Sequence, residues 1–132
     1  VINDEEAKLL TKEFNLIKSA KKIMGWGAKY VIIKKGEHGS LLFFEDVVFP
    51  SAAFSLEKIV DPTGAGDSFA GAVMGYLASK NKTDLATIKK SMIYGNVMGS
   101  FAVEGYGPEV LLRIKKSDIK KRITQYEKMT RF

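Results

Sequence analysis

The sequence lacks cysteine and has little histidine or proline, with one His and three Pro in 132 residues. Without cysteine there is no disulfide framework, no Cys-ligated zinc and no thiol nucleophile, and the composition fits a reducing compartment. We therefore predict a cytoplasmic protein. The single histidine, His38, has no second histidine with which to form a His-based metal site. No apolar run approaches the roughly 18–20 residues that span a bilayer, so we expect no membrane partner.

The net charge of +6 is a property of the last twenty residues. Residues 113–132 hold eight Lys or Arg and two acids, whereas residues 1–112 are net neutral. A basic nucleic-acid-binding domain would bind with an affinity that falls steeply with salt and depends on this tail. The neutral remainder argues against that class, so we predict no nucleic-acid partner and interpret the tail as a solvated helix face.

The chain is 45% hydrophobic and 27% charged, which is typical of one globular domain over residues 1–132. Apolar periodicity, with glycine and proline as stops, predicts helices over 4–11, 14–24, 65–79, 84–103 and from a cap at Ser117. A β-branched run predicts a strand at 30–34. Residues 40–44 and 47–50 are expected to pair as a hairpin that Pro50 ends, and 59–61 to be a strand end. This order predicts an α/β fold in which helices cover a small sheet. The pairs Gly71/Gly75 and Gly95/Gly99 are expected to let two helices pack closely.

The most informative segment is 61–71, Asp-Pro-Thr-Gly-Ala-Gly-Asp-Ser-Phe-Ala-Gly. Glycines at a helix start leave unpaired N–H groups at the positive end of the helix dipole, which together form an anion site. Asp67, in the first turn, is placed to accept a proton from a hydroxyl beside the bound anion. The alternative is a plain tight turn with Asp67 as a stabilising first-turn acid. The segment is not a P-loop, because no Gly-x4-Gly-Lys-Ser/Thr occurs in the sequence. It is not a dinucleotide fingerprint either, because Phe69 stands where the third glycine should be.

The residues Asp-Pro-Thr-Gly-Ala-Gly-Asp-Ser-Phe resemble, at every position, the second signature of the PfkB/ribokinase carbohydrate kinases. The resemblance implies a ribokinase-like three-layer αβα fold, a Rossmann-like sheet flanked by helices. Residues 1–132 correspond to its C-terminal, ATP-side portion, without the N-terminal sugar-binding half and the lid, so we expect this portion alone to be inactive. It implies transfer of the ATP γ-phosphoryl group to a hydroxyl of a sugar or nucleoside. Asp67 is then the base, and the backbone of Gly64, Ala65 and Gly66 contributes to the anion hole.

The resemblance extends to nucleotide-binding residues along the chain. It implies that a strand-end Gly-x-x-Gly contacts ATP, that one residue lies beside the adenine, and that the loop 103–107 lines the adenine pocket. The residues so assigned are Lys34, Gly36, Glu37, His38, Gly39, Gly66, Asn96 and Val103. The alternatives are that the two glycines only close the link between strands and that His38 is an exposed loop residue.

Metal sites are also implied. Asn3-x-x-Glu6 resembles the family's Asn-x-x-Glu near magnesium-bound phosphates, so Glu6, and Asn3 indirectly, are candidates for Mg²⁺. The same residues also fit a helix cap with Glu at its third position. Asp61 is a candidate for a monovalent cation such as K⁺, or is a plain strand-end residue.

Other interpretations stay open. One alternative is a nucleotide-binding pseudo-kinase module, which would bind ATP without turnover. Within the enzyme class, the alternative is a pyridoxal or hydroxymethylpyrimidine kinase of the same superfamily. The resemblance leaves the acceptor among ribose, fructose, a keto-deoxy sugar acid, a sugar phosphate and a nucleoside. It allows a homodimer of the full-length protein.

Overall fold

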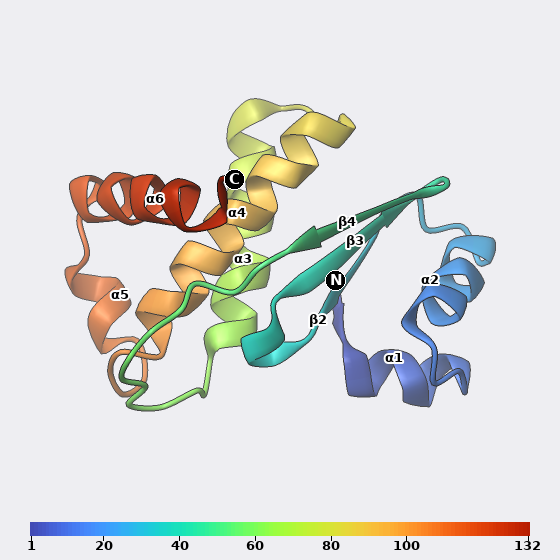
Figure 1. Ribbon diagram of the computed structural model, residues 1–132, viewed down its shortest axis with the longest axis horizontal. Coiled ribbons are helices and arrows are strands. Elements are labelled where there is room, and N and C mark those ends of the chain that lie inside the picture. Colours follow the sequence, from blue (N-terminus) through green and yellow to red (C-terminus); the bar gives the residue numbers. More distant parts are fainter. The chain divides into compact units, whose positions relative to one another are not determined.

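The computed structural model describes all residues from 1 to 132, and the chain divides into two compact units. Residues 1–51 form a sheet with two helices, which we call the sheet unit (Figure 1). Residues 52–132 form four helices, which we call the helical unit. No helix combines the length and apolar character needed to cross a membrane.

The sheet unit contains a mixed sheet in the order β1-β2-β3-β4. Its strands are β1 (Ile2–Asn3), β2 (Val31–Lys34), β3 (Ser40–Phe44) and β4 (Val47–Ser51). β1 pairs parallel to β2, and the other pairs are antiparallel. The predicted strand and hairpin are therefore confirmed. Pro50, however, does not end the hairpin, because β4 is an edge strand and edge strands tolerate the missing N–H of proline.

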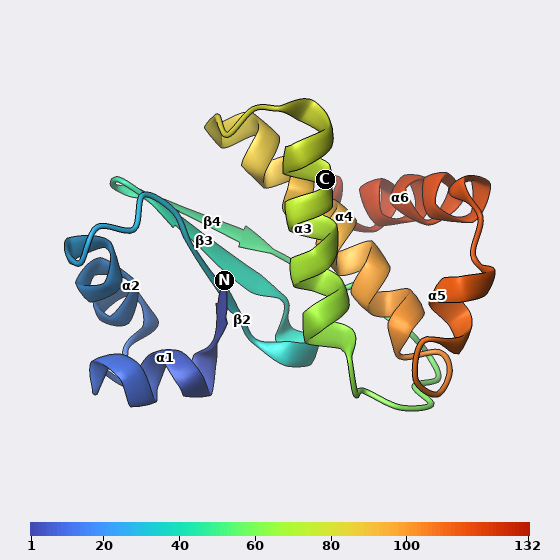
Figure 2. The same cartoon turned by 180° about the vertical axis from the view of Figure 1, so that it is seen from behind.

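Two helices, α1 (Asp4–Thr11) and α2 (Leu16–Gly25), cover one face of this sheet (Figure 2). Side chains alternate along a strand, so Val31 and Ile33 of β2 share that face. They pack there with Ala7, Ala20 and Phe43. The second helix begins at 16 and not at 14, because the Asn15 side chain accepts hydrogen bonds from the N–H groups of residues 17 and 18.

The helical unit consists of α3 (Ala65–Lys80), α4 (Leu85–Ala102), α5 (Glu109–Arg113) and α6 (Lys116–Thr130). α3 and α4 lie side by side in both ribbon views (Figures 1 and 2). The sequence allows either Thr83 or Asp84 to cap α4, and Asp84 is the cap, because its side chain accepts a hydrogen bond from the Thr87 N–H group. The short helix α5 was not predicted.

The last helix packs through the face that its sequence predicts. Tyr126 of α6 lies in a core with Val97, Phe101 and Val110, and Ile119 and Ile123 pack against it. The predicted cap at Ser117 is wrong. The helix begins at Lys116, because the Asp118 carboxylate reaches back to accept a hydrogen bond from the Lys115 N–H group at 2.8 Å.

The four paired glycines fall into two groups. A Cβ on Gly95 would lie 2.7 Å from the Phe69 ring, and a Cβ on Gly99 would lie 3.3 Å from the Ala65 carbonyl oxygen. These two glycines therefore permit the close packing of α4 against α3 that was expected. Gly71 and Gly75 would meet nothing within 4 Å, so the same expectation is wrong for them.

Because the two groups of glycines differ, we expect opposite changes in the free energy of unfolding when one glycine of each group is replaced by alanine. Gly95→Ala is expected to lower the free energy of unfolding by about 1–3 kcal/mol, because overpacking against Phe69 outweighs the gain in helix propensity. Gly75→Ala, on the open face of α3, is expected to raise it by about 0.5–1 kcal/mol. Urea unfolding of both variants measures these changes. A Gly95→Ala protein as stable as the Gly75→Ala protein contradicts the packing account.

Candidate active site

The turn before α3 has the conformation of an anion site. Gly64 precedes the helix with φ 84°, in the left-handed region that glycine favours. No side chain caps the helix. The Ala65 N–H donates to Pro62 O at 3.3 Å and the Ser68 N–H to Gly64 O at 2.9 Å, whereas those of Gly66 and Asp67 have no acceptor. Two N–H groups at the positive end of a sixteen-residue helix are thus available to an anion.

Asp67 lies in the same helical turn as these N–H groups. It is exposed and is the only acidic residue in the first turn of α3. An accessible carboxylate next to an anion site is arranged to take a proton from a hydroxyl that approaches the anion. The turn therefore places two N–H groups without acceptors and an exposed carboxylate in one helical turn, and their roles as anion site and general base stay predictions.

Asp61 and Val103 are brought together by the backbone. The Val103 carbonyl accepts hydrogen bonds from the N–H groups of Val60 and Asp61, at 2.8 and 3.2 Å. The predicted strand end at 59–61 is wrong, because these donors are satisfied by the end of α4 and not by a neighbouring strand. The segment that leads into the turn before α3 is thus hydrogen-bonded to the first residue of the 103–107 loop.

The Asp61 side chain closes a turn of its own. Its Oδ1 accepts a hydrogen bond from the Thr63 N–H at 2.9 Å. This bond, with a further one from the Thr63 hydroxyl, lowers the pKa of Asp61 below its ordinary value. A carboxylate that stays ionised supplies the negative charge that a K⁺ site needs. Its role toward a cation stays a prediction.

Asn96 has a partner within the helical unit. Its Nδ2 donates to the Tyr126 hydroxyl at 3.2 Å, and that hydroxyl donates to the Ala52 carbonyl at 2.6 Å. The buried Asn96 amide therefore links α4 to α6 and, through the Tyr126 hydroxyl, to Ala52, the first residue of the segment between β4 and α3. Its place beside the adenine stays a prediction.

In the sheet unit, the predicted Gly-x-x-Gly loop follows Lys34 at the end of β2. Residues Gly36–His38 form a 3₁₀ turn, closed by the Lys35 N–H donating to Gly39 O at 2.7 Å. Gly36 and Gly39 both have positive φ, 57° and 84°, so glycine is required to close the link. Glu37 and His38 are exposed and lie 3.7 Å apart as an ion pair when His38 is protonated. Contact between this loop and a nucleotide stays a prediction.

The cap predicted at the start of α1 is present. Asn3 Oδ1 accepts a hydrogen bond from the Glu6 N–H at 2.7 Å, and Glu6 Oε2 accepts one from the Asn3 N–H at 3.0 Å. Nowhere do three or more acidic or histidine side chains gather into a metal cluster. A single carboxylate such as that of Glu6 fits Mg²⁺, which usually takes one or two carboxylates and keeps phosphate and water ligands. The exposed Glu6 carboxylate has acceptor capacity beyond its capping bond.

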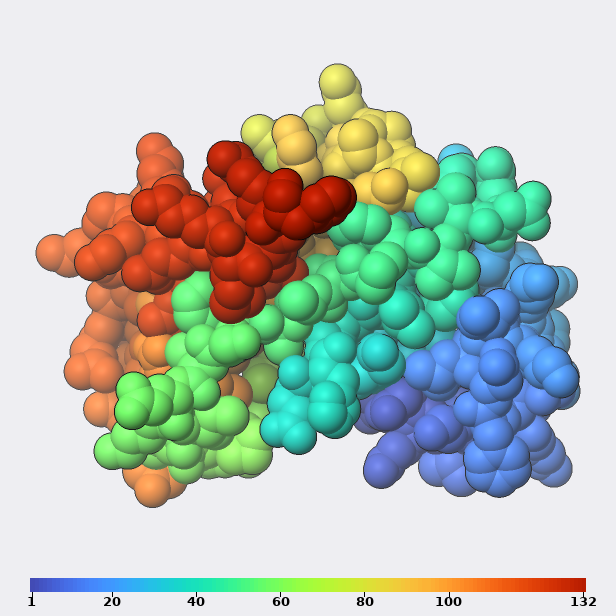
Figure 3. Space-filling view, viewed as in Figure 1, coloured from blue at the N-terminus to red at the C-terminus, as the bar shows by residue number.

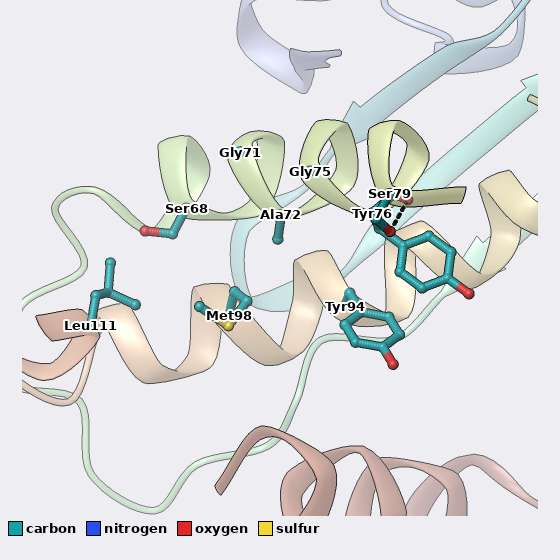
Figure 4. Close-up of a pocket in the computed structure, with 9 residues that line it drawn as sticks. All are labelled: Ser68, Gly71, Ala72, Gly75, Tyr76, Ser79, Tyr94, Met98 and Leu111. Carbon is teal, nitrogen blue, oxygen red and sulfur yellow. Dashed lines mark hydrogen bonds between the residues drawn. The ribbon is translucent and has the colours of Figure 1, made fainter. Parts of the chain in front are cut away.

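A groove of about 520 Å³ runs along α3 and α4, from Ser68 to Ser79 on α3 (Figure 4). Aromatic and apolar side chains line most of the groove, and the ring centroids of Tyr76 and Tyr94 lie 4.6 Å apart. Gly71 and Gly75 form part of its wall, which explains why a Cβ added to either would meet no atom within 4 Å. The lining residues are Ser68, Gly71, Ala72, Gly75, Tyr76, Ser79, Tyr94, Met98 and Leu111.

One basic residue of the tail departs from the solvated face that the sequence predicts. Most of the Lys and Arg side chains of 113–132 are exposed, and much of this segment is at the surface in Figure 3, in red. Arg122 instead has a side chain only 16% exposed and forms an ion pair with Glu104 at 2.7 Å. The spacing of Arg122 in the sequence could have predicted this burial. Arg122 comes three residues after Ile119 and four before Tyr126, which places it beside the apolar face of the helix.

Comparison with known proteins gives the family. The family model described as pfkB family carbohydrate kinase matches residues 1–114. The cytidine kinase of Thermococcus kodakarensis is 41% identical over 83 residues, which are 61% of this chain and 28% of that protein. A bifunctional ribokinase/ribose-5-phosphate isomerase A of Fructilactobacillus sanfranciscensis is 34% identical over 115 residues, 81% of this chain and 20% of that protein. The chain therefore spans less than a third of either relative.

The crystal structure of a ribokinase from Thermotoga maritima matches with a TM-score of 0.76 at 26% identity, over 92% of this chain and 40% of that one. The expected fold class, ribokinase-like α/β with a sheet flanked by helices and represented here in part, is thereby confirmed. The sequence signature at 61–69, the glycine turn and helix start that it forms and the family match agree. The chain belongs to the pfkB family of carbohydrate kinases.

Proposed function

We propose that residues 1–132 are the ATP-side portion of a kinase that transfers the γ-phosphoryl group of ATP to a hydroxyl of a sugar or nucleoside. The observation that carries the proposal is the turn before α3, where the N–H groups of Gly66 and Asp67 lack acceptors beside the exposed Asp67 carboxylate. The family match and the kinase names of the relatives support the reaction class.

In the proposed reaction, Asp67 takes the proton of the acceptor hydroxyl as its oxygen bonds to the γ-phosphorus and the bond to the β-phosphate oxygen breaks. The N–H groups of Gly66 and Asp67 stabilise the negative charge on the transferred group, whereas the Ala65 N–H, which was expected to contribute, is already bonded to Pro62 O. Phosphoryl transfer depends mainly on such positioning and charge stabilisation, so a fixed turn and one base suffice on this side of the site.

The proposal assigns nucleotide-binding or cation-binding roles to residues in each of the two units. In the sheet unit, Lys34 and the loop 36–39 contact the nucleotide. In the helical unit, Asn96 and Val103 lie near the adenine, and Asp61 serves a monovalent cation. Glu6 would hold Mg²⁺, which would supply positive charge to the phosphates, and Asn3 would orient Glu6 through the cap.

Which sugar or nucleoside accepts the phosphoryl group is tested with the full-length protein. The relatives' names include a nucleoside kinase and a ribokinase, so cytidine and ribose are the first acceptors to compare. We expect ADP release from ATP that depends on one of these acceptors, while a calorimetric titration shows ATP binding. ATP binding without turnover on a wider panel of sugars and nucleosides indicates the pseudo-kinase alternative.

A further inference from the structure

We propose that Arg122 is a positioning residue for the nucleotide site, which holds the 103–107 loop through Glu104. The inference rests on the proposed function, in which this loop lines the adenine pocket. Arg122 Nη2 donates to Glu104 Oε1 at 2.7 Å, and Nη1 donates to Ser100 Oγ at 3.1 Å. A residue of the basic tail is thus bonded to the end of α4 and to the first part of the loop.

Aromatic rings fix the same guanidinium group. Its central carbon lies 3.6 Å from the centroid of the Phe101 ring and 5.2 Å from that of Phe54. Arginine stacks on aromatic faces while its planar fork donates hydrogen bonds, which lysine does not reproduce. The Ser100 hydroxyl donates to the Val97 carbonyl at 2.6 Å, so its oxygen is oriented to accept from Arg122. The side chain is held on several sides, unlike a solvated tail residue.

The consequence for the site follows from what adjoins Glu104. The preceding residue is Val103, whose carbonyl accepts the N–H groups of Val60 and Asp61. By holding Glu104, Arg122 stabilises both the loop and the segment that leads into the phosphate turn. The turn itself is closed locally, by the Ser68 N–H bonding to Gly64 O. Loss of Arg122 should therefore weaken nucleotide binding more than it slows the chemical step.

The test uses Arg122→Met and Arg122→Lys in the full-length kinase, with ATP titration and steady-state kinetics. The Met variant is expected to raise the ATP Kd about tenfold, the scale of a lost charge-assisted hydrogen bond, with kcat at saturating ATP within about threefold of wild type. The Lys variant keeps the charge without the planar fork, so we expect a rise of about threefold.

A second Arg–Glu pair in the helical unit provides the matched control. Arg113 and Glu109 lie 3.9 Å apart with side chains 68% and 58% exposed, whereas Glu104 is 30% exposed. Arg113→Met should leave the ATP Kd unchanged. Combining Arg122→Met with Glu104→Gln should weaken binding no more than about twofold beyond the Met variant alone, because both changes remove one interaction.

An unchanged ATP Kd in the Arg122 variants overturns the proposal, even if their melting temperatures fall, because the contact is then only structural. An equal rise in Arg113→Met overturns it too. If Arg122→Met does not fold, Arg122→Lys and Glu104→Gln decide by the same criterion. A wild-type protein that binds no ATP overturns the proposed function itself, before any variant is compared.

Discussion

Replacing Asp67 by asparagine is expected to lower kcat of the full-length kinase by roughly 10²–10⁴, the usual size of a lost general base. Asparagine keeps the size of the side chain and removes its capacity to take a proton. The ATP Kd should change little, because the N–H groups of the turn belong to the backbone. Steady-state kinetics with a parallel ATP titration separates the two effects.

Asp84→Asn is the matched control for this substitution. Asp84 is also an exposed acid at the start of a helix, but its carboxylate caps α4 by accepting hydrogen bonds from the N–H and hydroxyl groups of Thr87. Asparagine caps helices about as well as aspartate, so this variant should keep both stability and kcat. If Asp67→Asn retains activity within about tenfold of wild type while ATP binding is intact, Asp67 is not the base.

Local patterns account for the parts of the fold that were predicted. The cap of Asn3 and Glu6, the cap of Asp84 and the hairpin of β3 and β4 depend on partners a few residues away. Such signals are present in any short window of the sequence, so they can be found without knowing the tertiary structure.

Partners distant in sequence account for two features that were missed. Residues 59–61 have the composition of a strand, yet the N–H groups of Val60 and Asp61 bond to Val103, some forty residues away. Arg122 looks like one more base in a basic tail until Glu104 and Phe101 are found beside it. At the candidate site, the turn at 64–67 was predictable because glycines, helix start and acid are consecutive, whereas the support from α6 was not.

Gly64→Ala is expected to lower kcat of the full-length kinase by about 10²–10³, the range found when one donor to a developing negative charge is lost. The φ of 84° at Gly64 costs a residue with a Cβ about 1–2 kcal/mol. Relief of that strain turns the backbone that leads into α3, and with it the N–H groups of Gly66 and Asp67. No atom lies within 4 Å of the added Cβ, so the effect comes from backbone conformation and not from a clash.

Gly27→Ala separates this effect from general destabilisation. Gly27 also has a positive φ, 114°, and open space around an added Cβ, but it follows α2 and has no part in the proposed site. Both variants should unfold at lower temperature, whereas only Gly64→Ala should lose kcat. Equal kcat in the two variants would mean that the N–H groups before α3 do not stabilise the transferred phosphoryl group. A loss confined to Gly64→Ala, beside the loss in Asp67→Asn, would assign charge stabilisation and proton transfer to the same helical turn.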